Sequence, residues 1–462
     1  MSEIKKLSRV FILMLIMAIL YMPQSFGVSK KAAKNDVTLN QAVENTVYVS
    51  KIDFDEVLKK AKEHSYDLKI ADFNVLISKQ GEKGARSEYF PKLNFSAGTE
   101  YTKNFRDTRD TTIMSIGDAF VNPYTRYQSI LGINLSYNVF DFGVRGNSLK
   151  MAKEDTAIKE LEELEKLQEL NLNVVDTYTK ILIASKQMEL NKEILALEEK
   201  NLELKTRLFK AKEISKTEMN DATAKVAMKK KNISELKSMM SESLNWLSFY
   251  TGDQYDIDNL KVADIKRTNF DVSAFQDYTK SITWQIHEKQ IKKKELEVKV
   301  AKKMNYPKVT AYSRYYLYGS NHSSYAESFD DIGPSNYTIG GSVNMPLFDG
   351  MKNSANIQKT KLELQQMQVE RDKAMAQFMQ RLAVMRSNLM YLNEQIEEND
   401  KIIAELSDKE KSVKRLTSKK LASPLEENET KIELLEQKID KDKNSITAVA
   451  LTRGIQILTE TY

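Results

Sequence analysis

The sequence of 462 residues predicts a mainly α-helical chain that is interrupted twice by short β segments and contains an internal two-fold sequence repeat. Twelve of its 15 glycines fall in two ranges, 81–146 and 319–350, whereas residues 147–251 contain neither glycine nor proline. Half of the aromatic residues fall in 89–142 and 306–348. Elsewhere the sequence is rich in Lys, Glu, Leu, Ala and Gln, which is typical of long helices. A doubly wound α/β enzyme needs glycine-containing turns at regular spacing and is therefore disfavoured.

Charge and cysteine content exclude several further classes. The chain has 70 Lys and Arg residues against 65 Asp and Glu residues, a net charge of +5. A nucleic-acid-binding protein usually has a stronger or more localised basic excess, so no nucleic acid partner is expected. Cysteine is absent, which excludes a disulfide framework, a thiolate nucleophile, a Cys-ligated metal and a lipid anchor on an N-terminal cysteine.

Residues 1–27 have the pattern of a signal peptide. Three basic residues precede an uncharged apolar run at 10–22, and the small residues Ser25 and Gly27 follow it. The alternative is an uncleaved anchor, but the run is shorter than the ~20 residues that span a bilayer. We therefore expect export and cleavage near Gly27. Residues 28–52 are expected to form an N-terminal lead-in.

The remaining chain divides into two similar halves, 53–252 and 253–462. Short motifs recur at a fixed offset of 208 residues, and an upstream motif recurs at 216. Because insertions collect in exposed loops, we expect a loop of different length between the two sets of motifs. The recurring motifs are Phe140-Asp141 with Phe348-Asp349, Arg207-Leu208 with Arg415-Leu416, and Tyr89-Phe90-Pro91-Lys92-Leu93 with Asn305-Tyr306-Pro307-Lys308-Val309.

Each half is expected to contain a helix, two strands, a long helix and a shorter helix. The long helices lack glycine and keep near-helical apolar spacing, which is typical of coiled coils. A continuous helix of that length extends roughly 100 Å. The predicted helices after the opening one span about 146–211, 217–250, 271–304, 351–417 and 424–453.

Four predicted strands alternate apolar and polar residues over about ten positions each. This length suits a tilted transmembrane strand of ~9–11 residues, although a soluble sandwich would show the same alternation. The export signal and the aromatic residues at the segment ends favour the membrane. The predicted strands span about 92–102, 129–139, 308–318 and 337–345.

Four strands cannot close a barrel, and lipid does not tolerate an open sheet edge. Several chains must therefore contribute strands. Two chains would give eight strands with a filled interior, and three would give twelve strands with room for a lumen.

Several motifs resemble those of the outer-membrane efflux protein family, the TolC-like channel-tunnels, over roughly residues 53 to 462. The stretch 54–68 is similar to the family's opening helix, and residues 89–93 and 306–309 are similar to its strand starts. Met345-Pro346-Leu347-Phe348-Asp349-Gly350 is close to its Pro-Leu-Phe-Asp-Gly-Gly motif. The order, duplication and spacing of these motifs make the combination specific.

The resemblance implies a homotrimer in which a twelve-stranded β-barrel in outer-membrane lipid continues into a long α-helical barrel in the periplasm. Such ducts pass drugs or proteins, as efflux or type I secretion channels. They work docked to a periplasmic adaptor (membrane fusion) protein and an inner-membrane RND or ABC transporter. The chain has no P-loop, because the glycines at 81 and 84 lack the required spacing, so we expect a partner to supply the energy.

The resemblance also assigns the tips of the two helical hairpins to adaptor docking, at Lys212, Ser215, Lys420 and Ser423. The family usually has glycine where this sequence has Lys212 and Lys420. Two alternatives follow. Either lysine adopts the left-handed cap conformation with strain, or the turn differs from the one that glycine forms in the family. This departure leaves the type of adaptor open.

Acidic residues just past each tip are the candidate periplasmic aperture. Glu426 and Glu429 lie where the family carries its aperture carboxylates, and Glu218 and Asp221 are at the equivalent places of the first half. A spacing of three puts each pair on one helical face. Under threefold symmetry they would form rings that favour cations. The alternative is an ordinary solvated helix face.

No motif suggests an enzyme, a cofactor or a metal site. The three histidines, His64, His287 and His322, are scattered, and His287-Glu288 lacks the second histidine of a zinc-protease helix. Two other functions remain open: a periplasmic coiled-coil adaptor or scaffold protein, and a passive porin. An adaptor would not need four ten-residue strands with aromatic ends, and a porin would not need such long helices.

Overall fold

The computed structural model describes residues 48–103, 114–116, 119–121, 127–267, 270 and 278–459. The predicted signal peptide at 1–27 and the lead-in up to residue 47 lie outside the described residues. The chain forms two compact units, which we name the sheet unit (within 80–153 and 293–363) and the helical unit (within 42–79, 154–292 and 364–462).

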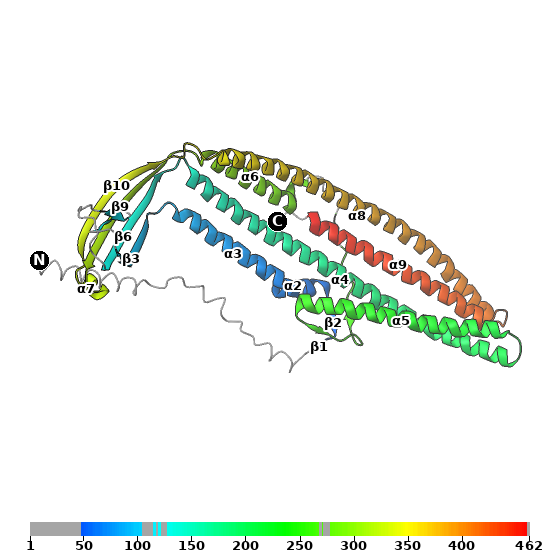
Figure 1. Cartoon of the computed structure of the whole chain (residues 1–462). Helices are drawn as coiled ribbons and strands as arrows, with labels where there is room; N and C mark the ends of the chain where they lie inside the picture. Colours follow the sequence, from blue (N-terminus) through cyan, green and yellow to red (C-terminus); the bar gives the residue numbers. More distant parts are fainter. Residues whose placement is uncertain are drawn as a thin grey trace. The chain divides into compact units, whose positions relative to one another are not determined.

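Helices make up most of the described chain (Figure 1). Two of them, α4 and α8, have 67 residues each, and the helices that follow them, α5 and α9, have 36 each. The helices are α2 (Phe54–His64), α3 (Tyr66–Ser87), α4 (Val144–Lys210), α5 (Lys216–Thr251), α6 (Ile282–Lys303), α7 (Tyr325–Asp330), α8 (Lys352–Ser418) and α9 (Pro424–Thr459).

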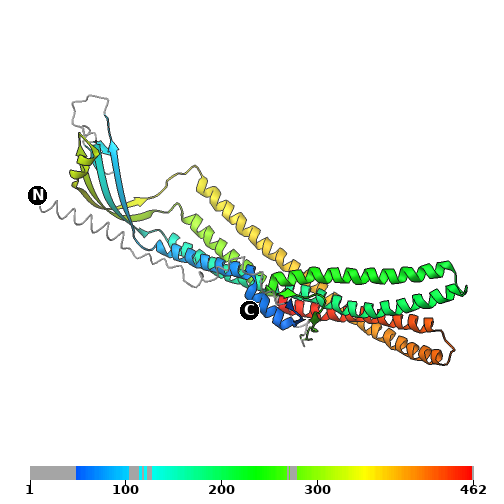
Figure 2. The same cartoon turned by 90° about the horizontal axis from the view of Figure 1, so that it is seen from below.

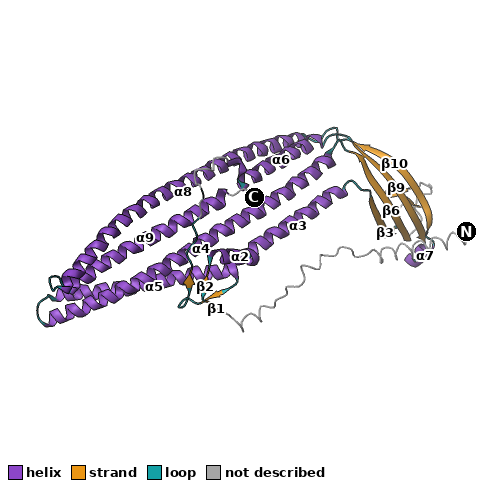
Figure 3. Cartoon of the chain, turned by 180° about the vertical axis from the view of Figure 1, so that it is seen from behind, coloured by secondary structure: helices purple, strands orange, loops and turns teal. Residues whose placement is uncertain are grey.

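The sheet unit contains four antiparallel strands in the order β10-β9-β6-β3 (Figure 3). The four are β3 (Lys92–Tyr101), β6 (Tyr127–Phe140), β9 (Lys308–Asn321) and β10 (Gly333–Asn344). The short strands are β1 (Tyr48–Val49), β2 (Lys51–Ile52), β4 (Met114–Ile116), β5 (Ala119–Val121), β7 (Gln254–Tyr255) and β8 (Lys261–Val262).

The strand register divides the sheet into an apolar and a polar face. Leu135 lies opposite Leu93 and Ser313, so these three share one face, whereas Asn134 lies opposite Asn94 and Arg314 on the other. The apolar face is largely exposed in a single chain: Leu93 is 67%, Ile339 70% and Val343 69% exposed. An exposed apolar surface of this extent marks a site of contact with protein or lipid. The side chains of the apolar face include Leu93, Phe95, Leu131, Ile133, Leu135, Tyr315, Leu317, Tyr337, Ile339 and Val343.

The helical unit contains two helical hairpins, α4–α5 (teal to green in Figure 2) and α8–α9 (yellow to red). Its main core is built on α4, where Tyr178 and Ile181 are fully buried. The Tyr178 hydroxyl donates to the carbonyl of Ala263 at 2.7 Å, and burial raises the pKa of Tyr178 well above its usual range. A second core, formed by Ile194, Leu197, Ile432 and Leu435, packs α4 against α9.

Two predicted helices differ from the observed ones. The opening helix is broken at Ser65, whose N–H donates to Ala61 and whose Oγ accepts from Leu68 N–H, so it ends α2 and begins α3. The helix predicted over 271–304 begins at Ile282, because residues 278–280 form a 3₁₀ turn. Ser281 Oγ then accepts the N–H of Trp284 as a new helix start. Residues 271–277 lie outside the described part.

Within the described residues, no helix is both long and apolar enough to cross a membrane.

Candidate functional site

The turn of the first hairpin is a Schellman cap closed by a lysine. Lys212 N–H donates to Phe209 C=O, and Glu213 N–H donates to Leu208 C=O, which is the paired bonding that defines this cap. Lys212 has φ of 62°, the left-handed conformation that glycine adopts without steric cost. The lysine therefore keeps the turn that a glycine would form, and holds it at the expense of strain.

The second hairpin repeats this turn 208 residues later. Lys420 N–H donates to Thr417 C=O, Leu421 N–H donates to Leu416 C=O, and Lys420 has φ of 63°. The strain predicted for the lysine-bearing tips is thus present in both, and the alternative of a different turn is wrong.

Serine caps the returning helix in each hairpin. Ser215 Oγ accepts the N–H of Glu218 at 3.2 Å, and Ser423 Oγ accepts the N–H of Glu426 at 3.1 Å. Pro424 follows as the first helical residue, a position where its missing N–H costs nothing. The serines of both tips, for which the sequence predicts adaptor docking, are therefore N-caps in the structure.

The acidic residues beyond the caps are exposed but differ in their bonding. Glu218 completes a capping box, because its Oε2 accepts from Ser215 N–H at 2.7 Å and from Ser215 Oγ at 2.9 Å. The Ser215 backbone bond is the main reason why the pKa of Glu218 lies below its usual value. Among the described residues, the carboxylates of Asp221, Glu426 and Glu429 have no such hydrogen bond or ion pair. Of the four acidic residues, only Glu218 is therefore engaged by its own helix cap.

Behind the tips, the two hairpins are joined by a buried polar contact that the sequence pattern did not indicate. Asn428 Nδ2 donates to Asn201 Oδ1 at 2.8 Å, and Asn201 is only 3% exposed. Ion pairs join the same two hairpins farther along, between Lys431 of α9 and Glu193 of α4 at 2.7 Å and between Lys229 of α5 and Glu436 of α9 at 2.8 Å. The first two turns of α9, which carry Glu426 and Glu429, are therefore held against α4.

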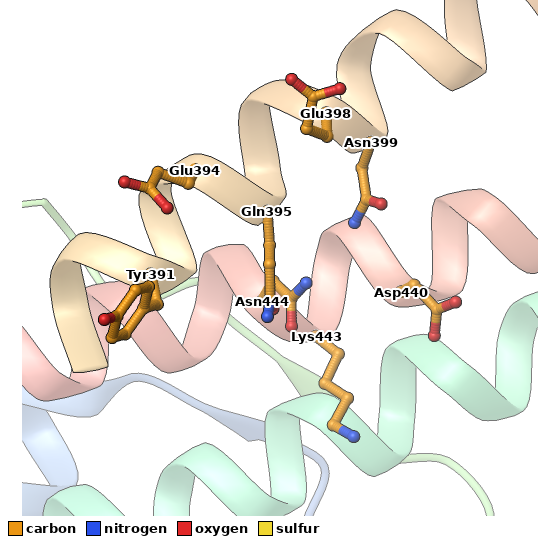
Figure 4. A pocket seen from close by; sticks show the side chains of 8 residues that line it. All are labelled: Tyr391, Glu394, Gln395, Glu398, Asn399, Asp440, Lys443 and Asn444. Atoms are coloured by element: carbon orange, nitrogen blue, oxygen red, sulfur yellow. The ribbon is translucent and has the colours of Figure 1, made fainter. Parts of the chain in front are cut away.

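A polar groove of about 600 Å³ lies between α8 and α9 (Figure 4). Its lining carries three carboxylates and one ammonium group, so it is acidic on balance. Glu398 is bound to Lys401. No His, Asp or Glu cluster in the described chain has the arrangement of a metal site. The lining residues are Tyr391, Glu394, Gln395, Glu398, Asn399, Asp440, Lys443 and Asn444.

The three histidines are not brought together. His64 packs against Tyr66, with their ring centroids 5.2 Å apart. Burial among the helices lowers the pKa of His287, and His322 follows β9 in the sheet unit.

The sequence of residues 57–253 matches the model of the family described as outer membrane efflux protein. No curated protein matches the sequence.

Solved structures of bacterial outer-membrane channels share the fold. VceC of Vibrio cholerae matches with a TM-score of 0.71 and 16% identity, over 87% of this chain and 95% of that one. The CmeC channel of Campylobacter jejuni matches with a TM-score of 0.73 and 16% identity, over 88% of this chain and 86% of that one. CusC, whose structures describe conformational changes during folding and transmembrane channel formation, matches with a TM-score of 0.70 and 15% identity. The match covers 90% of this chain and 95% of that one.

The family match over the first half, together with the channel fold over nearly the whole chain, confirms the family resemblance that the sequence motifs indicate. Residues 57–253 thus match the outer membrane efflux protein family, and nearly the whole chain shares the fold of solved outer-membrane channels.

Proposed function

We propose that three copies of this chain form one duct, in which their sheets close a twelve-stranded barrel in the outer membrane and their helices continue the lumen through the periplasm. The observation that carries this proposal is the four-stranded sheet with an exposed apolar face. Its edge strands, β3 and β10, have no partner on their outer sides among the described strands. Lipid does not tolerate such edges, so another copy must pair with each of them.

The polar face supports an open lumen. It carries Asn94, Asn134, Tyr316 and Arg314, and Tyr316 donates to Asn134 across the strands at 3.1 Å. Two copies would give eight strands, whose interior side chains fill the space. Twelve strands leave room for water, which can hydrate these polar side chains.

Exposed apolar stripes on the helices support contacts between copies. On α3, Tyr66, Ile70, Phe73 and Ile77 recur at helical spacing and are 54–66% exposed. On α8, Val369 is 67% and Val384 is 52% exposed. Burial of such stripes against a second copy would stabilise a helical wall by ~25 cal/mol for each Å² removed from water.

The hairpin tips are the proposed docking sites for a periplasmic adaptor, at Lys212, Ser215, Lys420 and Ser423. An RND or ABC transporter of the inner membrane would supply the energy, and the duct itself would be non-enzymatic. Glu426 and Glu429, with a smaller part for Glu218 and Asp221, would line the periplasmic aperture. Two halves descended from one duplication account for the two tips with equivalent turns.

The test of the trimer uses the absence of cysteine from the chain. Ala97→Cys on β3 and a second cysteine on β10 lie on opposite edges of one sheet, separated by β6 and β9. At ~4.8 Å per strand these two edges are about 14 Å apart, too far for a disulfide within one chain. The second cysteine is placed in turn at Ile339, Gly341 and Val343, because these three positions sample different strand registers between neighbouring copies.

Oxidation in membranes should produce a ladder of bands that ends at three chains for at least one pair. Each single-cysteine variant is the matched control and should give at most two chains. A ladder that ends at two chains, or no cross-link at any of the three pairs with a monomeric native mass, would contradict the trimer.

The alternative of a periplasmic coiled-coil adaptor is not favoured, because the chain shares its fold with outer-membrane channels and matches the efflux protein family. Extraction of the protein from membranes by high salt or alkali would instead support the adaptor.

A further inference from the structure

We propose that the connection between β9 and β10 is a lipid-interface anchor: helix α7 lies on the outer, apolar face of the sheet and places Tyr325 and Phe329 in the headgroup region of the membrane. This inference rests on the proposed function, because it takes the apolar face as the lipid-facing one.

The register places α7 on the apolar face. Ser129 lies on the same side of β6 as Leu131 and Ile133. Its hydroxyl is hydrogen-bonded to that of Ser328 in α7 at 2.6 Å, and both serines are fully buried. Since Ser328 donates to the Tyr325 carbonyl at 2.8 Å, Ser129 is the donor to Ser328. The helix is thus fastened to the side of the sheet that carries the apolar residues.

A glycine in β9 makes this close approach feasible. Gly319 lies opposite Ser129, and a Cβ at Gly319 would come within 2.0 Å of the Ser328 carbonyl oxygen. Backbone therefore packs directly on backbone here, and any side chain at 319 would displace α7.

Both ends of the α7 connection are fixed by local hydrogen bonds. Asn321 Nδ2 donates to Asp331 at 3.1 Å, and Asn321 Oδ1 accepts the N–H of Ser323. Ser324 caps α7 by accepting from Glu327 N–H. These bonds make the connection an ordered segment that packs against the strands.

The outward side of α7 continues an aromatic cluster. The rings of Tyr101 and Tyr127 lie 5.0 Å apart, and those of Tyr127 and Tyr325 lie 4.9 Å apart. Tyr101, Tyr325 and Phe329 remain 44%, 41% and 46% exposed. Tyr325 and Phe329 are four residues apart, so they share one side of the helix. The tyrosines combine an apolar ring with a polar hydroxyl, which membrane interfaces favour, and Phe329 adds apolar surface beside Tyr325.

A second aromatic cluster lies at the opposite end of the strands, where Phe142 contacts Phe140 and Tyr306 at 4.7 and 5.2 Å. Tyr127 and Phe140 are thirteen positions apart on β6, which is roughly 40 Å along a strand. At a barrel tilt of about 40° this corresponds to roughly 30 Å across the membrane. The two clusters are therefore spaced as the two girdles of a membrane barrel, and α7 belongs to the outer one.

The test places one cysteine at a time in the full chain, in lipid vesicles, and labels it with a nitroxide spin label. Phe329→Cys reports on α7, and Ile339→Cys reports on the middle of the apolar face. Ser342→Cys on the polar face and Met228→Cys on α5, which is 68% exposed, are the water-exposed references. Collision with oxygen, which concentrates in lipid, is compared with collision with a water-soluble nickel chelate.

We expect the oxygen-to-nickel ratio at 329 to exceed that at 228 and 342 several-fold, and to fall below that at 339. A ratio at 329 equal to that at 228, with 339 still in lipid, would overturn the anchor and leave the membrane sheet intact. A water-like ratio at 339 would overturn the proposed barrel as well.

Displacement of α7 gives a second readout with a matched control. Gly319→Ala should lower the ratio at 329 several-fold without changing that at 339. Gly98→Ala, where a Cβ meets nothing within 4 Å, should change neither. An unchanged ratio at 329 in the Gly319→Ala protein would show that the contact with β9 does not hold the helix in the interface.

Discussion

The two hairpin tips have the same backbone turn but use their carboxylates differently. Each ends with a lysine in the left-handed conformation and a serine N-cap. In the first tip Glu218 turns back to Ser215 and completes a capping box. In the second, Pro424 rigidifies the first turn, and Glu426 has no such bond within the described part of the chain. One carboxylate therefore stabilises its helix, while its equivalent is available to a ligand.

The largest expected effect is on ion selectivity. Neutralising the second tip, in Glu426→Gln with Glu429→Gln, should reduce cation selectivity several-fold and weaken block by divalent cations, because it removes the carboxylates that we propose form a ring at the aperture. The matched control is Glu218→Gln with Asp221→Asn, which removes the same charge from the first tip and should change selectivity less. Reversal potentials in a salt gradient measure both. Equal effects of the two double variants would remove the distinction between the tips, and an unchanged block after loss of Glu426 and Glu429 would contradict the aperture.

The next effect is on the caps. Ser215→Ala should cost about 1 kcal/mol of local stability, since it removes the cap of α5 and the hydroxyl partner of Glu218. Ser423→Ala should cost less, because Pro424 already fixes the first turn of α9. Hydrogen exchange of the first-turn amides should then accelerate about fivefold for α5 and less for α9. The opposite order would show that proline does not compensate for the cap.

Much of the fold was predictable from the sequence, because its pattern is local. The ten-residue alternation and the long glycine-free stretches lie where β3, β6, β9, β10, α4 and α8 are observed. The break at Ser65 was missed, since a single serine that ends one helix and starts the next leaves the apolar spacing almost unchanged. The start of α6 was placed too early for a similar reason: Ser281 acts as a cap only because of the 3₁₀ turn before it.

The candidate site was predictable only in part. Both tips have the Ser-x-x-Glu spacing of a capping box, Ser215 with Glu218 and Ser423 with Glu426. The sequence therefore does not indicate that only Glu218 bonds back to its cap. The bond between Asn201 and Asn428 joins residues 227 positions apart, and no periodicity indicates such a pair. Likewise, α7 has six residues, too few for a helical period to show.

A smaller effect concerns strain. Lys212→Gly and Lys420→Gly should each stabilise their tip by roughly 0.5–1 kcal/mol, because glycine adopts the left-handed conformation without a Cβ clash. Lys212→Ala and Lys420→Ala are the controls, which remove the charge but keep the clash. Slower exchange of the tip amides in the glycine variants alone would confirm strain. Equal changes in both kinds of variant would instead point to the lost charge.

The smallest effect is on pH dependence. The bonds from Ser215 hold the pKa of Glu218 below its usual value, so the cap is fully formed above the ordinary glutamate pKa of about 4.3. It is lost as the pH falls through the lower pKa of the folded protein. Exchange rates corrected for intrinsic pH dependence should rise in the first turn of α5 on acidification below about pH 4, and should rise less in Glu218→Gln. An acid response of the same size in that variant would exclude Glu218 as its cause.

The central claim, that this chain is an export duct of the outer membrane, is tested most directly by single-channel recording of the purified protein in a planar bilayer. We expect a trimeric species that produces small, cation-selective conductance steps, as a duct with a narrow acidic aperture would. A water-soluble species without conductance would contradict the claim.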